Sequence, residues 1–269
     1  MVLPLPTSLS PSKVSSFTDC ALAFRFSAID HLPEPPSLAA TRGTLVHAAL
    51  ERLFTLDPGD RTKAAAAECL AAAFAELQAH PELVGLELDD AAAATFYGEA
   101  EGLLEKYFRL EDPTTIVPIG IELKLEVELG GVRLRGIIDR LELDADGELV
   151  VTDYKTGRAP GERQEQQRLA GVAFYSLLCE RVFGRRPARV QLLYLADPVA
   201  IIATPTDRST RGVERKLAAV WTAVERACER EDFRPNPSRL CDWCGFKAYC
   251  PSFGGDVTLA DAYREQLSA

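Results

Sequence analysis

Two carboxylates and a lysine fall on adjacent predicted strands in the middle of the chain. Asp153 and Lys155 follow the apolar run at 149–151, and Asp139 lies on the preceding strand. Side chains two apart on a strand share a face, and a meander brings Asp139 beside them. Two such carboxylates would bind a hard divalent cation, leaving positions for water and a substrate phosphate. The lysine would orient or deprotonate the attacking water, or offset charge on the phosphate.

An ordinary surface salt bridge is the alternative interpretation of these three residues. Three charged groups at the end of a buried strand are costly unless they are paired or bound to a metal. The residues alone leave both interpretations open.

A second group of candidate ligands lies near the end of the chain, in the pattern Cys241-x₂-Cys244-x₅-Cys250. Thiolates at this local spacing bind a metal or an iron–sulfur centre. Besides a histidine, the candidates for a fourth ligand are Cys20, Cys69, Cys179 and Cys228. The last three fall in apolar helical patterns, where cysteine usually acts as a small hydrophobic residue. Cys20 is therefore favoured.

The secondary-structure elements that position these residues are predicted to be strands in the middle of the chain and helices toward both ends. The pattern changes near Ile116, and alternation from Ile121 to Leu129 predicts a strand. Further strands are predicted at 132–143, 148–155, 189–195 and 199–204, and helices at 162–183 and 209–230. Gly130-Gly131 predicts a two-residue turn. Near the start, Ser10 or Ser12 would cap one helix that carries Phe17, Cys20 and Phe24.

This order predicts a single α/β domain over residues 1–269, with helices at both ends. Its parts are N-terminal helices with Cys20 and His47 (1–60), a helical insertion (61–112), the sheet core (113–205) and a C-terminal helix with a cysteine cap (206–269).

Composition narrows the class of protein. Seven cysteines in 269 residues are too few for a small disulfide scaffold, and their clustering points to a reducing cytoplasm. A net charge of −10 argues against polyanion binding over the whole surface, although a local contact remains compatible with it. The apolar runs are too short to span a bilayer, and we see no secretion signal. No G-x-x-x-x-G-K-[ST] loop is present, so any DNA unwinding would need a partner.

The motifs Gly136-Ile-Ile-Asp139 and Asp153-Tyr-Lys155 resemble the PD-(D/E)XK nuclease superfamily. With SPSKVSSFTDC, RGTLVHAALE and the terminal cysteines in order, the chain is similar to RecB-type nuclease domains, including AddB-like helicase-nucleases and CRISPR-adaptation exonucleases. Only the helices at 61–110 lack a recognisable motif. The resemblance implies a restriction-endonuclease-like core, a central mixed β-sheet flanked by helices, with an Fe–S cluster joining the N- and C-terminal segments.

The resemblance also implies roles for single residues. The metal would be bound by His47, Asp139 and Asp153, with the Tyr154 carbonyl as a further ligand. Lys155 would be the catalytic lysine. Glu122 matches a carboxylate near the metal or its water, although Glu126 and Glu128 share its strand face.

The family's Q-x-x-x-Y motif on the following helix is only partly present. Tyr175 fits its end, but Gly171 stands where glutamine is expected. Gln167 lies one turn earlier on the same helical face and could reach the site. A buried Tyr175 with a solvated Gln167 is the alternative.

For the cysteines, the resemblance implies a 4Fe–4S cluster held by Cys20, Cys241, Cys244 and Cys250, which would staple the two ends of the chain. Trp243, Phe246 and Tyr249 would shield it. Zn²⁺ in the same four thiolates and free thiols are the alternatives.

We therefore expect a Mg²⁺- or Mn²⁺-dependent deoxyribonuclease, an exonuclease that hydrolyses phosphodiester bonds on single-stranded DNA ends in repair or recombination. Its partners would be DNA and a helicase or repair protein, with no membrane. One alternative is a catalytically silent Fe–S DNA-binding or scaffold subunit of a helicase-nuclease complex. Another is a stand-alone redox or zinc protein, which would leave the Asp153–Lys155 motif unexplained.

Overall fold

The computed structural model describes residues 2–268, except for the side chains of residues 162–170, 265, 267 and 268. The chain divides into two compact units, which are described separately below. The first unit comprises Met1–Pro35, Glu126–Gly136 and Arg211–Ala269, and the second comprises Pro36–Leu125 and Ile137–Thr210.

A five-stranded sheet organises the second unit. Its strands are β1 (Pro118–Leu129), β2 (Val132–Leu143), β3 (Leu149–Lys155), β4 (Arg189–Tyr194) and β5 (Val199–Ala203), in the order β1-β2-β3-β4-β5. The pair β3–β4 is parallel, whereas β2–β3 and β4–β5 are antiparallel, so the sheet is mixed. In the β2–β3 register, Arg140 lies opposite Thr152. Because side chains alternate, these two residues share one face, and their neighbours Asp139 and Asp153 share the other.

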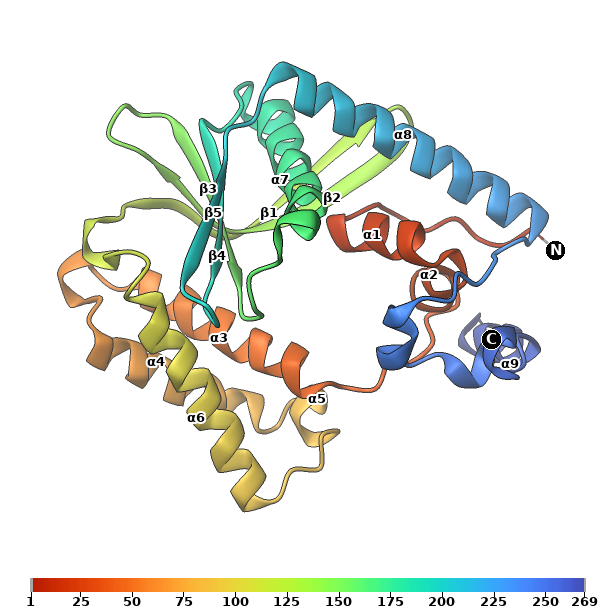
Figure 1. Ribbon diagram of the computed structural model, residues 1–269, viewed down its shortest axis with the longest axis horizontal. Helices are drawn as coiled ribbons and strands as arrows, with labels where there is room; N and C mark the ends of the chain where they lie inside the picture. The colour runs from red at the N-terminus through yellow and green to blue at the C-terminus, as the bar shows by residue number, and fades with distance from the viewer. Residues whose placement is uncertain (1, 269) are drawn as a thin grey trace. The chain divides into compact units, whose positions relative to one another are not determined.

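Helices cover both faces of this sheet. The helices α3 (Leu38–Thr55), α4 (Lys63–Leu77) and α6 (Asp90–Tyr107) lie together beside the sheet (Figure 1). Their buried side chains form one apolar core with Tyr154 and Leu193. The crossover helix α7 (Glu162–Phe183) joins β3 to β4, and its Tyr175 reaches Asp153 on the opposite face. The remaining elements of this unit are α5 (Pro81–Val84), η1 (Pro58–Asp60) and η2 (Pro113–Thr115).

Local sequence explains these elements. The helices α3, α4 and α6 begin after Ser37, Thr62 and Asp89, whose side chains accept a backbone N–H of the first turn. Gly130 and Gly131 both have positive φ, as the predicted turn between β1 and β2 requires. The predicted strands and the mixed sheet flanked by helices are thereby confirmed.

The first unit contains α1 (Pro11–Asp19), α2 (Ala21–Ala28), α9 (Thr258–Ser268) and, from residue 211 onward, α8 (Asp207–Arg230). Between α8 and α9 lie the short 3₁₀ helices η3 (Arg239–Trp243), η4 (Lys247–Tyr249) and η5 (Pro251–Phe253). The core of this unit includes Phe24, Phe26 and Phe246.

The prediction of one N-terminal helix through Cys20 is wrong. Cys20 is extended, with φ −159°, and separates α1 from α2. Its side chain is thus placed by a junction between helices, which the apolar spacing of Phe17 and Phe24 does not reveal. Within the described part of the chain, no helix is both long and apolar enough to cross a membrane.

Candidate functional site

Three potential metal ligands converge in the second unit. One ligand atom from each of His47, Glu122 and Asp139 lies within 4.8 Å of the other two, the only such group found among the described residues. The imidazole Nδ1 of His47 is 3.6 Å from Asp139 Oδ2 and 3.8 Å from Glu122 Oε1. Its Nε2 is 3.1 Å from the Tyr154 carbonyl oxygen. Histidine and carboxylate ligands in this arrangement suit a divalent cation.

Two backbone features bring these ligands together. Gly43 lies one turn before His47 on α3, and a Cβ placed there would be 3.3 Å from the Thr156 hydroxyl, so α3 closely approaches the end of β3. Glu122 has a φ of +46°, which is rare for a residue with a side chain and interrupts the alternation of β1. Glu126 and Glu128, which share its face in a regular strand, belong to the other unit.

Asp153 and Lys155 form an ion pair beside this group. Lys155 Nζ contacts Asp153 Oδ2, and the Tyr175 hydroxyl donates to Asp153 Oδ1 at 3.4 Å. The close group of three ligands contains Glu122 and not Asp153, so a metal-binding role for Asp153 stays a prediction. The side chain of Gln167 lies outside the described residues.

The buried carboxylates repel each other. Burial, and then the charge of Asp153, raises the pKa of Asp139 to about 7. Burial alone would lower the pKa of His47, but Glu122, Asp139 and Asp153 raise it above its usual value. Both shifts favour the protonated forms, so the group attracts positive charge, which a divalent cation would also supply.

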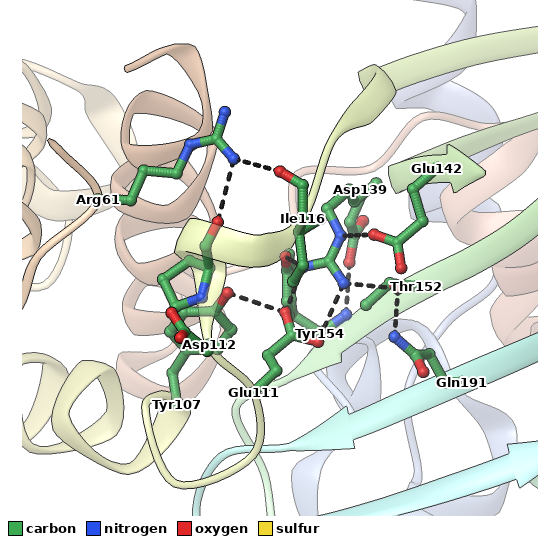
Figure 2. A network of polar contacts seen from close by, with 12 residues as sticks. Arg61, Tyr107, Glu111, Asp112, Ile116, Asp139, Glu142, Thr152, Tyr154 and Gln191 are labelled. Carbon is green, nitrogen blue, oxygen red and sulfur yellow. Dashed lines mark hydrogen bonds and ion pairs between the residues drawn. The ribbon is translucent and has the colours of Figure 1, made fainter. Parts of the chain in front are cut away.

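The opposite face of β2 and β3 carries a buried network of hydrogen bonds and ion pairs that was not predicted from the sequence. Its centre is Arg140, whose side chain has no exposed surface. Arg140 donates to Glu142 (2.7 Å), to the Tyr154 hydroxyl (2.6 Å), to Thr152 (3.1 Å) and to both carboxylate oxygens of Glu111. Figure 2 shows Glu142, Thr152 and Tyr154 gathered in this network.

A signal for this network was present in the sequence. Arg140 directly follows Asp139 in the strand GIIDRLEL. The two-residue period therefore places its side chain on the other face of the sheet, where the neighbouring Ile138 is apolar. An arginine on a buried face requires an anionic partner. The identity of Glu111, 29 residues earlier, could not be read from that pattern.

The four cysteines named for the cluster line one pocket in the first unit. Leu22, Phe26 and Phe246 also line it, and the backbone N–H groups of Asn236 and Ser238 donate to the sulfurs of Cys20 (3.5 Å) and Cys241 (3.4 Å). No three of the four sulfurs lie within 4.8 Å of one another. Trp243 is 80% exposed and therefore does not shield the pocket, contrary to expectation.

The other three cysteines lie elsewhere. Cys228 is in the core of the first unit, and Cys69 and Cys179 pack within the second. Burial raises the pKa of Cys228 to about 11 and that of Cys179 to about 12. Such thiols stay protonated, as expected for hydrophobic packing rather than for metal binding.

Fold and geometry together define an α/β protein with a histidine–carboxylate group beside the first three strands of a mixed sheet. Residues 8–251 match the PD-(D/E)XK nuclease superfamily, and the chain belongs to this superfamily.

Individual relatives cover the chain to different extents. The gene 69 protein of Mycobacterium phage L5 is 30% identical over 136 residues, which are 49% of this chain and 44% of that protein, so the chain spans less than half of this relative. The gene 69 protein of Mycobacterium phage D29 is 26% identical over 267 residues, covering 91% of this chain and 96% of that protein.

A solved structure is similar in fold. The crystal structure of a candidate exonuclease from Eubacterium rectale matches with a TM-score of 0.56, over 88% of this chain and 87% of that chain. Only 13% of the residues are identical, so the similarity concerns the fold alone.

Proposed function

We propose that this protein is a divalent-metal-dependent deoxyribonuclease that hydrolyses phosphodiester bonds at DNA ends. One observation carries the proposal: the His47, Glu122 and Asp139 ligand atoms lie within 4.8 Å of one another, on the face of the sheet that also bears Asp153 and Lys155. Membership of the nuclease superfamily gives this geometry its chemical meaning.

His47, Glu122 and Asp139 would hold Mg²⁺ or Mn²⁺, with Asp153 and the Tyr154 carbonyl as further ligands. The bound cation would polarise the phosphate and lower the pKa of the attacking water. The Tyr154 N–H donates to Asp139 Oδ2 at 2.7 Å, which orients that carboxylate. Lys155 remains 39% exposed, so its ammonium can contact a phosphate and offset the charge that develops there. Tyr175 would keep Asp153 in place through its hydroxyl.

The substrate preference, pathway and partner are proposed from the resemblance to RecB-type nuclease domains. We propose an exonuclease that prefers single-stranded DNA and acts in repair or recombination in the cytoplasm, alongside a helicase or repair partner. The fold of the Eubacterium rectale candidate exonuclease is compatible with this assignment.

We also propose that Cys20, Cys241, Cys244 and Cys250 hold a 4Fe–4S cluster. Four thiolates on one Zn²⁺ would be about 3.8 Å apart, because each Zn–S bond is about 2.3 Å long in a tetrahedral site. Among the described residues, these four sulfurs do not form such a close group. A four-iron cluster takes one thiolate on each iron and tolerates a wider arrangement, and N–H donors to the sulfurs are typical of such sites.

The activity is tested with anaerobically purified protein on end-labelled single- and double-stranded DNA, in Mn²⁺, Mg²⁺ or EDTA. We expect metal-dependent cleavage that falls about 10²–10³-fold in Lys155→Ala, the usual loss when a group that stabilises transition-state charge is removed. Lys124→Ala, which removes an exposed lysine from β1, is the matched control and should cleave like the parent. Equal cleavage by the parent and Lys155→Ala would overturn the proposed site. No cleavage by cluster-containing parent protein would instead favour the scaffold alternative.

The cluster is tested by iron, sulfide and zinc content. We expect Cys20→Ser to lose iron and sulfide, while Cys69→Ser, which changes a cysteine of the other unit, keeps both. Zinc in place of iron in the parent protein would contradict the proposal, as would equal iron in the two variants.

A further inference from the structure

Arg140 uses the whole hydrogen-bonding capacity of its guanidinium. Nε donates to Glu142, Nη1 to Glu111 and Tyr154, and Nη2 to Glu111 and Thr152. An arginine side chain has five N–H donors, so each donor has a partner. Only a planar guanidinium in this position can reach all of these acceptors at once. A lysine, with three donors on one nitrogen, could not replace it.

This guanidinium contacts each of the elements that carry His47, Asp139 and Asp153. It extends from β2, next to Asp139 in the chain. It binds Thr152 and Tyr154 of β3, on either side of Asp153. It also stacks on the ring of Phe54, 4.7 Å from the ring centroid, and Phe54 lies two turns after His47 on α3.

Tyr154 connects the network to the ligands on the other face. Its hydroxyl accepts from Arg140, its backbone N–H donates to Asp139, and its carbonyl oxygen lies 3.1 Å from His47 Nε2. Figure 2 shows Tyr154 and Asp139 joined in this way. A displaced Tyr154 side chain would therefore move both peptide groups that contact the ligands.

We propose that Arg140 is a positioning residue for the metal site, acting through Tyr154 to hold His47, Asp139 and Asp153 at ligand distance. This inference rests on the proposed function and extends it to the opposite face of the sheet. A purely stabilising role explains the network less well, since a buried ion pair often contributes no more stability than well-packed apolar residues. A fork that contacts three ligand-bearing elements restricts their relative geometry, as the partners of metal ligands commonly do.

Arg61 offers a matched control within the same unit. It is also a buried arginine stacked on Phe54, at 5.0 Å, but it donates to the backbone carbonyls of Phe54, Leu56, Pro113 and Ile116. None of these residues belongs to the ligand group. Arg61→Lys should therefore reproduce the loss of buried packing on Phe54. It leaves the contact between Arg140 and Tyr154 in place, so it should not disturb the ligands.

The test compares Arg140→Lys, Arg61→Lys and the parent full-length protein in three measurements. The first is Mn²⁺ binding, monitored through the electron paramagnetic resonance signal of free Mn²⁺. The second is the Mn²⁺ concentration that gives half-maximal cleavage, and the third is the thermal midpoint. We expect Arg140→Lys to weaken Mn²⁺ binding about 10- to 100-fold, the usual effect of changing a partner of metal ligands. Saturating Mn²⁺ should restore most of its kcat, with the KM for DNA unchanged. Arg61→Lys should lower the thermal midpoint and keep the parent's Mn²⁺ affinity.

Parent-like Mn²⁺ affinity in Arg140→Lys would overturn the inference. If that variant does not fold, Tyr154→Phe replaces it, because it removes only the hydroxyl that Arg140 holds. A weaker Mn²⁺ affinity then supports the inference, and an unchanged one overturns it. A parent protein that binds Mn²⁺ but cleaves no DNA would overturn the proposed function alone, since the binding measurement still tests Arg140. A parent that binds no Mn²⁺ would overturn both.

Discussion

The two faces of β2 and β3 carry charge at neighbouring positions but balance it differently. On one face, Asp139 and Asp153 are 8% and 4% exposed, and only Asp153 has a lysine partner. On the other, Arg140 is fully buried and each of its donors is used. One position along the chain thus separates a carboxylate whose charge is balanced only in part, by His47 and the Tyr154 N–H, from a fully paired guanidinium.

This difference indicates what each face contributes. Charge that stays uncompensated in a folded protein costs stability, and such a cost is typical of sites that bind or react. The face with Arg140 fixes the relative positions of β2 and β3, which carry Asp139 and Asp153 on their other face. Changes on the two faces should therefore have opposite effects on stability, and the predictions below follow from that contrast.

The largest effect should come from breaking the paired face. Arg140→Met leaves the buried Glu142 and the partly buried Glu111 without their cation, and we expect it to destabilise the protein by about 3–5 kcal/mol in urea unfolding. Adding Glu142→Gln to this variant should recover part of the loss, because one uncompensated charge is removed. If Arg140→Met alone were as stable as the parent, the contacts of Arg140 would not contribute to stability together.

On the ligand face, removal of a charge should stabilise. Asp139→Asn keeps an acceptor for the Tyr154 N–H and removes a carboxylate whose pKa burial and Asp153 raise to about 7. We expect the metal-free variant to be about 0.5–2 kcal/mol more stable at pH 8, with cleavage lost, as in other trade-offs between stability and activity. Asp146→Asn, at an exposed turn position, is the control and should change neither. Destabilisation by Asp139→Asn would contradict the contrast between the faces.

The same carboxyl group predicts a pH dependence. The pKa of Asp139 is raised from 3.8 to about 7 in the folded protein, so between these values the folded state binds more protons than the unfolded state. Its contribution to stability is therefore fully present below about pH 4 and is lost as the pH rises through 7. In EDTA, the stability difference between Asp139→Asn and the parent should grow over this range and level off above it. A difference that does not vary with pH would refute the raised pKa.

The smallest effect should come from Tyr175→Phe. The hydroxyl donates to Asp153 at 3.4 Å, near the limit of a hydrogen bond, so its loss should cost about tenfold or less in kcat/KM. Tyr97→Phe, on α6, should leave kcat/KM unchanged. A much larger loss in Tyr175→Phe would assign the hydroxyl a direct part in the reaction.

Much of the fold could be predicted because it is encoded locally. The alternation in β1 and β2, the Gly130-Gly131 turn and the periodicity of α7 each depend on a few neighbouring residues. The left-handed Glu122 could not be predicted, because regular alternation along β1 gives no sign of a positive φ and leaves Glu122, Glu126 and Glu128 equivalent.

Contacts between residues far apart in the sequence could not be predicted around the site either. Asp139, Asp153 and Lys155 share a face by strand geometry alone, which the sequence revealed. The pairing of Arg140 with Glu111 joins positions 29 residues apart. Such long-range contacts leave no periodic pattern.

The measurement that tests the central claim most directly is the thermal midpoint of the full-length protein with Mn²⁺ and with EDTA, for the parent and for Asp139→Asn. A cation bound only to the folded state at about 100 times its Kd adds about 2.7 kcal/mol. For a chain of this size, we therefore expect the midpoint of the parent to rise by about 5–10 °C. Asp139→Asn should show almost none of this rise. An equal rise in both proteins, or none in the parent, would contradict a metal site at His47, Glu122 and Asp139.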